Sequence, residues 1–255
     1  MFTVLNVTKR RNTIFEKLFG CFIRDEYNVR TMGVYRGAPF YEMNVTIGKR
    51  GIDVQRVIDC VGKCSKRLVT NNFDLLPQNK DLALFKSDKL YRKMMQNTFV
   101  KILENNSLKK NPLPICVIDE KAENTDFIKR LCDYALTLTI VTHKNEKYSS
   151  ICEDVTEETG LCPMHKNNVS NENIIINLDD NNMIIYDKEG SSLIENGEEF
   201  TVPEIYNYLK PQEINKYDFY SALYELCGVF SLAECIFDTI KVNHEKKNVA
   251  GIHFS

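Results

Sequence analysis

Polar side chains that could bind or transform a ligand follow three apolar runs in the second half of the chain. Asp119 and Glu120 come directly after the run PICVI, and Thr142 and His143 come directly after the run LTLTIV. An acidic side chain could hold a ribose hydroxyl, a metal ion or a substrate amine, whereas threonine and histidine could hydrogen-bond a ligand or transfer a proton. The candidate ligand-binding residues are, in chain order, Asp119, Glu120, Thr142, His143, Asn177 and Asp179.

The pattern around these residues predicts how they come together. Three apolar runs alternate with two helical patterns at 114–119, 124–135, 136–143, 146–159 and 173–179. Strands that alternate with helices form βαβ units and a mainly parallel sheet, and ligands bind such sheets outside the carboxyl ends of the strands. We therefore expect a Rossmann-like three-layer α/β domain over residues 111–255, with helical segments at 202–209 and 217–242.

The first half of the chain has no such alternation and predicts an α+β domain over residues 1–110. The runs YNVRTMGVYR and FYEMNVTIG flank turn residues at 36–39 and predict a hairpin. Asp53 predicts the start of an amphipathic helix over 54–61. Polar residues and prolines at 105–114 predict a linker. The other predicted elements are a strand at 2–7, a helix at 14–23, a strand at 67–70 and a helix at 88–103.

Charge is distributed unevenly between these two segments. Residues 1–110 hold 21 Lys and Arg against 10 Asp and Glu, a net of +11, whereas residues 111–255 hold 12 against 25, a net of −13. A basic segment of this kind is one signal of a nucleic-acid partner. The basic residues are scattered and no nucleic-acid-binding signature accompanies them, so attraction between the two segments, or an uneven spread of solvated lysines, explains the split better. Nucleic-acid binding through residues 1–110 remains an alternative.

Cofactor and metal motifs are incomplete. The segment after the first strand, DEKAENTD, has no glycine, and no Walker A sequence occurs, so no NAD, FAD or P-loop nucleotide site is expected. Cys162 and His165 have a C-x-x-H spacing, and Cys152 lies upstream, so three zinc ligands could meet if the loop folded back. A fourth ligand is not evident, so no metal is expected and the cofactor is left open.

One family resemblance follows from the strand ends. The acid Asp119 after the first strand and Thr142 after the second are similar in placement to the Asp nucleophile and the Ser/Thr phosphate contact of haloacid-dehalogenase-like phosphatases. The resemblance would imply phosphoryl transfer through Asp119. That family has a second Asp two residues later, where this chain has Lys121, so membership is not assigned.

The composition narrows the class of protein. With 43% hydrophobic and 27% charged residues, the chain has the composition of a folded globular protein. No stretch approaches the ~18 consecutive apolar residues of a membrane span, and the first residues lack the features of a signal peptide. The nine cysteines are an odd number and several lie within apolar runs, which predicts reduced thiols in a cytoplasmic protein.

The function expected from these observations is recognition of a small molecule or a protein partner, including a regulatory one, at a strand-end crevice between two domains. The first alternative is an enzyme acting on a small polar or phosphorylated substrate in the interdomain cleft. An ionisable pair such as Asp119 with His143 within hydrogen-bond reach would favour the enzyme. The sequence leaves the ligand and the oligomeric state open.

Overall fold

The chain divides into two compact units. The computed structural model describes residues 1–10, 25–48, 51–169, 172–188, 190–211 and 213–254. The first unit comprises residues 1–91 and 202–233, and the second comprises residues 92–201 and 234–255. Each unit contains helices and one sheet, which confirms the predicted α/β class.

This division does not follow the predicted boundary at residue 110. Residues 92–110 belong to the second unit, because the helix α3 (Lys89–Asn105) carries the chain into it. Residues 202–233 return to the first unit, which a division at one linker cannot describe. Whether either unit folds alone as a domain stays a prediction.

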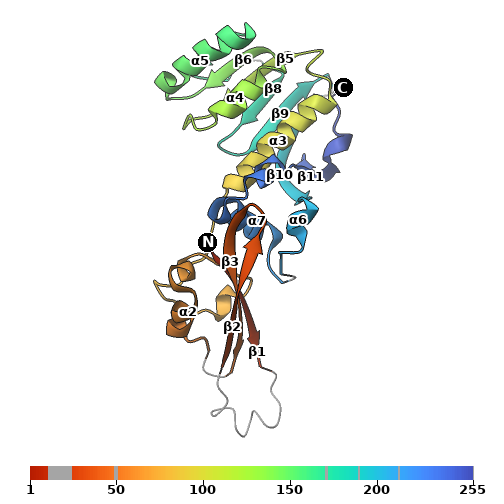
Figure 1. Ribbon diagram of the computed structural model, residues 1–255. Helices are drawn as coiled ribbons and strands as arrows, with labels where there is room; N and C mark the ends of the chain where they lie inside the picture. The colour runs from red at the N-terminus through yellow and green to blue at the C-terminus, as the bar shows by residue number, and fades with distance from the viewer. Residues whose placement is uncertain (11–24, 49–50, 170–171, 189, 212, 255) are drawn as a thin grey trace. The chain divides into compact units, whose positions relative to one another are not determined.

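The first unit is built on a four-stranded sheet with β1 near its centre. The strand order is β2-β3-β1-β4, in which β1 is parallel to β3 and β4, and β2 is antiparallel to β3. Figure 1 labels β1, β2 and β3 of this sheet. The predicted hairpin is therefore confirmed as β2 with β3. The bounds are β1 Thr3–Lys9, β2 Glu26–Val34, β3 Gly37–Ile47 and β4 Leu68–Val69. The helix predicted at 14–23 lies outside the described residues.

Alternating side chains of β1 bury both faces of this sheet. Leu5 and Val7 belong to an apolar cluster with Val57 of α2 (Val54–Val61). On the opposite face the Phe2 ring stacks on Phe40 with centroids 5.0 Å apart, and Phe219 of α7 (Lys216–Cys227) meets both rings edge-on. The sheet of the first unit thus lies between α2 and α7, because successive strand residues point to opposite faces.

The helix α2 begins and ends where its sequence predicts. The Asp53 side chain accepts a hydrogen bond from the backbone N–H of Arg56 at 3.3 Å, which satisfies one of the unpaired donors of the first turn. Gly62 follows the last turn with a φ of 56°, a conformation that favours glycine. The smaller helical elements of this part of the chain are Gly62–Lys66, Phe73–Leu75, Glu204–Asn207 (α6) and Phe230–Glu234.

The second unit is built on an eight-stranded sheet that is parallel at one end and antiparallel at the other. The strand order is β12-β11-β10-β9-β8-β5-β6-β7. The pairs among β8, β5, β6 and β7 are parallel, as the alternation of strands and helices predicts, and the remaining pairs are antiparallel. The bounds are β5 Leu113–Ile118, β6 Ala135–Val141, β7 Met164–Lys166, β8 Ile174–Asn177, β9 Asn182–Asp187, β10 Gly190–Phe200, β11 Phe237–Val242 and β12 Glu245–Asn248.

The helices of the second unit connect and cover the parallel strands. α4 (Thr125–Leu131) joins β5 to β6 and buries Phe127, Ile128 and Leu131. α5 (Asn145–Thr159) joins β6 to β7 and ends at Gly160, whose φ of 73° confirms the predicted helix end. The two helices contact each other, and the Gln96 amide of α3 donates to Asn124 before α4 at 2.7 Å.

The prediction that 217–242 is helical throughout is wrong. α7 ends at Cys227, because Gly228 takes a left-handed conformation with a φ of 74°. Residues 237–242 form β11, in which Phe237, Ile240 and Val242 are buried. The backbone N–H of Phe237 donates to the hydroxyl of Thr98 on α3 at 3.0 Å, which anchors the start of this strand.

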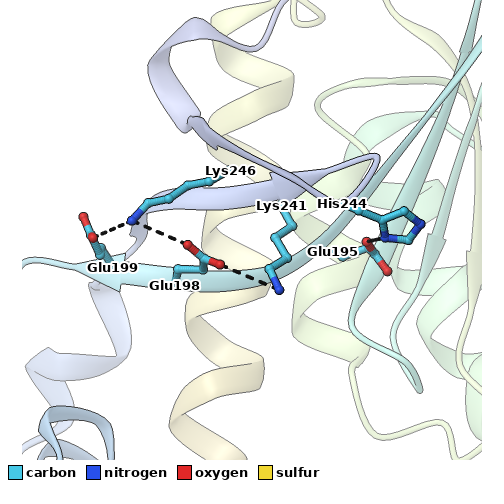
Figure 2. A network of polar contacts seen from close by, with 6 residues as sticks. All are labelled: Glu195, Glu198, Glu199, Lys241, His244 and Lys246. Carbon is cyan, nitrogen blue, oxygen red and sulfur yellow. Dashed lines mark hydrogen bonds and ion pairs between the residues drawn. The ribbon is translucent and has the colours of Figure 1, made fainter.

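Charged side chains line the antiparallel end of this sheet, as Figure 2 shows. The Lys246 Nζ lies 2.5 Å from Glu199 Oε1 and 3.5 Å from Glu198 Oε2, and Lys241 Nζ lies 3.8 Å from Glu198. His244 in the turn between β11 and β12 contacts Glu195 at 2.9 Å. Every residue of β12 is exposed. A charged outer strand of this kind resists pairing with another sheet edge.

Candidate functional site

The candidate residues lie at the point where the parallel strands of the second unit change order. β5 pairs with β6 on one side and with β8 on the other. The connection after β5 leads to β6, whereas the connection after β8 leads in the opposite direction, to β9. Ile118 at the end of β5 is in register with Val141 and with Asn177. Such a switch point is where open α/β sheets form their ligand crevices.

Asp119 is buried and organises the loop before α4. Its carboxylate accepts hydrogen bonds from the backbone N–H groups of Asn124 at 3.0 Å and of Glu123 at 3.4 Å. The phenol of Tyr148 on α5 donates to the same carboxylate, and both side chains are buried. Burial raises the pKa of Tyr148, and the hydrogen bond to Asp119 raises it further. These contacts give Asp119 a structural role, because the carboxylate is enclosed by donors of its own chain.

Glu120 connects the three strand-end loops. Its carboxylate Oε2 lies 3.0 Å from Nε2 of His143, in the loop after β6. Its backbone N–H donates to Oδ2 of Asp179, in the loop after β8, at 3.0 Å. The Glu120 side chain is 43% exposed and that of His143 is 74% exposed, so a molecule from solution can reach this pair.

Thr142 and Asn177 shape the loops and use their polar atoms locally. The Thr142 hydroxyl accepts from the backbone N–H of Lys144 at 3.1 Å. The Asn177 side-chain oxygen accepts from the N–H groups of Asp179 at 3.1 Å and of Asp180 at 3.2 Å, and its amide donates to the Asp180 carboxylate at 2.8 Å. Their contribution to the site is therefore to fix the positions of Asp179 and of the residues after β6.

A hollow of about 460 Å³ opens beside the exposed pair. It is lined by His143, Lys144, Glu146 and Lys147, which follow β6 and begin α5. The hollow therefore combines an imidazole and two ammonium groups with a carboxylate. The sequence analysis missed Lys144, Lys147 and Tyr148. All three lie within five residues directly after His143, and this nearness to a predicted strand end is the signal that could have found them.

The three possible zinc ligands do not form a metal site in the described part of the chain. His165 directs its Nε2 to the backbone oxygen of Thr142 at 3.0 Å. Cys152 and Cys162 lie near enough that a charge on Cys162 adds to the raised pKa of Cys152, after the larger effect of burial. Among the described residues, no three His, Cys, Asp or Glu side chains group in a way that could hold a metal ion.

The charge split is smaller when it is counted over the compact units. The first unit holds 18 Lys and Arg against 13 Asp and Glu, a net of +5, and the second holds 15 against 22, a net of −7. Tyr27, one aromatic available for stacking on bases, has its hydroxyl bound to the N–H of Asp53 at 2.9 Å and its ring under the guanidinium of Arg56. Both observations weaken the argument for a polyanion surface.

No protein-family model, curated protein or solved structure matches the chain. Among the described residues, no helix is long and apolar enough to cross a membrane. The geometry at the strand ends is therefore the ground on which a function can be proposed.

Proposed function

We propose that the protein recognises a small polar molecule at the strand-end crevice of its second unit. The observation that carries this proposal is the position of Glu120, which contacts both His143 and Asp179 from the loops after β6 and β8. The Rossmann-like order β8-β5-β6-β7 supports it, because its switch point is the usual place for a ligand.

The charges of the crevice favour a hydroxylated ligand that also carries a phosphate. Lys144 and Lys147 supply cations to an anionic group, and both are exposed beside the hollow. The carboxylate of Glu120 can accept from a ligand hydroxyl, and His143 can donate or accept. A protein partner presenting the same groups would use the same contacts.

Amide chemical shifts of the full chain, titrated with ribose 5-phosphate, ribose and inorganic phosphate, test this proposal. We expect saturable shifts at residues 119–121, 142–147 and 178–180 with ribose 5-phosphate, and weaker binding of the two fragments. Glu120→Gln and Lys147→Gln should each weaken binding by about tenfold, since each removes one charged hydrogen-bond partner. Glu158→Gln, an exposed change elsewhere on α5, is the matched control. The proposal would be contradicted if ribose 5-phosphate caused no shifts at these residues, or if Glu120→Gln and Lys147→Gln bound it as tightly as Glu158→Gln.

The pair Glu120–His143 also favours a second candidate function, an enzyme acting on a phosphorylated substrate. A carboxylate that orients an imidazole is a common arrangement for general acid–base catalysis. Turnover of p-nitrophenyl phosphate by the full chain would test this candidate. We expect His143→Asn to abolish turnover and Glu158→Gln to preserve it, whereas turnover that survives His143→Asn would exclude this role.

The buried thiols support a cytoplasmic location as part of the proposal. Cys116, Cys132 and Cys227 are free and buried among apolar residues, where they act as small core side chains. Such thiols persist in a reducing compartment.

A further inference from the structure

The first unit contains a pocket that shares no residue with the crevice of the second unit. It has a volume of about 470 Å³ and lies at the carboxyl end of β4, where Leu68 and Thr70 form part of its wall. Because β4 is parallel to β1, this end of the strand is also the end at which open α/β sheets bind ligands. Volumes of about 300–1,000 Å³ are typical of small-molecule sites.

The apolar wall of the pocket is held by backbone pairing. The N–H of Leu68 donates to the oxygen of Ala83 at 2.9 Å, and the N–H of Phe85 donates to the oxygen of Leu68 at 2.8 Å. Leu84 therefore forms an isolated parallel β-bridge with Leu68 of β4. Leu84 is half-buried and supplies accessible apolar surface, whereas Leu68 is fully buried in the core of this unit.

Asp218, in the first turn of α7, also lines the pocket. The side chain of Asn215 accepts from the N–H of Asp218 at 3.1 Å, which fixes this turn. The Tyr217 hydroxyl donates to the backbone oxygen of Ser87 at 3.0 Å and accepts from the N–H of Tyr91 at 3.1 Å. These bonds hold segment 87–91 against α7, so the pocket is formed before any ligand enters.

Two opposite charges face this pocket without pairing with each other. Lys86 and Asp218 both line it, yet no ion pair joins them among the described residues. Burial raises the pKa of Asp218, and the charge of Lys86 opposes this rise in part. Asp88 adds a second carboxylate to the rim. The pocket therefore offers one ammonium, from Lys86, and two carboxylates, from Asp218 and Asp88, beside an apolar wall.

We propose that this pocket binds a small zwitterion with an apolar body, such as an α-amino acid with an aliphatic or aromatic side chain. The ligand's ammonium group would bind Asp218, its carboxylate would bind Lys86, and its side chain would pack on Leu84. A ligand with both charges satisfies both protein groups at once, whereas a ligand with one charge leaves the other group without a partner. This binding is independent of the function proposed for the second unit.

Titration of the full chain with L-phenylalanine, followed by amide chemical shifts, tests the inference. We expect saturable shifts at residues 68–70, 84–88 and 218. Phenethylamine and 3-phenylpropionate each lack one of the two charges and should bind about tenfold more weakly. Asp218→Asn and Lys86→Gln should each reduce the affinity for L-phenylalanine by about tenfold. Asp74→Asn and Lys80→Gln, at exposed positions of the same unit, are matched controls and should leave it unchanged.

Three results would overturn the inference. The first is the absence of saturable shifts with L-phenylalanine at millimolar concentration. The second is phenethylamine binding as tightly as L-phenylalanine, which would make the site one for simple cations. The third is affinity in Asp218→Asn and Lys86→Gln equal to that of the controls, with the spectra showing all four variants folded.

Discussion

Tyr148 on α5 donates the hydrogen bond of its phenol to the carboxylate of Asp119 at the end of β5, and solvent reaches neither side chain. The contact joins the helix that follows β6 to the strand at the centre of the parallel sheet. It makes Asp119 part of the framework under the crevice, while the neighbouring Glu120 is the group presented to solution.

Replacing Tyr148 by phenylalanine should lower the free energy of unfolding by about 1–3 kcal/mol, the cost of leaving a buried charged acceptor without one of its donors. The ring volume is unchanged, so the loss reports the hydrogen bond. Urea unfolding of the full chain measures it, with Tyr186→Phe at an exposed position as the control. Equal stability of the two variants would show that the contact contributes nothing.

Stability at alkaline pH should depend on the same phenol. Below pH ~10 the phenol is protonated in both states, so it adds no pH dependence. Above that pH the unfolded chain loses the proton, whereas the folded protein retains it because burial and Asp119 raise the pKa of Tyr148. Unfolding is then favoured, so above pH ~10 the free energy of unfolding should fall more steeply in the wild type than in Tyr148→Phe. Parallel curves for the two proteins would argue against this coupling.

Thiol reactivity should divide the cysteines into two groups. Burial raises the pKa of Cys116 to about 12 and of Cys132 and Cys227 to about 11, and only the thiolate is a nucleophile. Cys60 and Cys162 are exposed. Iodoacetamide at pH 8 should therefore alkylate the exposed pair first, as peptide mass spectrometry can follow. In denaturant all sites should react alike, and rapid native labelling of Cys116 would contradict its burial.

Gly197 permits the close approach of β10 and β11. A Cβ added at this position would lie 2.2 Å from the ring of Phe237, far inside a normal contact. Gly197→Ala should therefore cost about 1–3 kcal/mol of stability, whereas Gly251→Ala, where a Cβ meets nothing within 4 Å, should cost much less. Combining Gly197→Ala with Phe237→Leu should cost less than the sum of the two changes. If the two stability costs add fully, the destabilisation by Gly197→Ala does not come from its contact with the Phe237 ring.

Local sequence patterns were sufficient to predict the parallel strands of the second unit, but they did not predict β11 near the end of the chain. The apolar runs of β5 and β6 are each followed by a helix, α4 and α5, so the alternation of strands and helices is visible in the sequence. β11 was hidden because its run FDTIKV follows a helical pattern and pairs with β10, about forty residues earlier in the chain. Pairing between distant segments leaves no periodic signal of its own.

The sequence predicted which strand ends come together at the candidate site, but it did not predict which side chains pair there. The strand ends do bring Glu120, His143 and Asp179 together, since parallel strands end at one edge of a sheet. The suggested pair of Asp119 with His143 is replaced by Glu120 with His143, because residue 119 still points into the framework and residue 120 points out. Which of two adjacent acids is exposed depends on Tyr148, a partner on another element.

The order of segments along the chain couples the folding of the two units during synthesis, because part of the first unit lies between two paired strands of the second. β10 ends at Phe200 and its partner β11 begins at Phe237, and the residues between them belong to the first unit. A nascent chain that has left the ribosome only as far as residue 201 exposes one edge of β10 with its backbone groups unpaired. Slow folding of segment 202–233 would prolong that exposure. A mutation in α7 could thus promote aggregation through a sheet to which α7 does not belong.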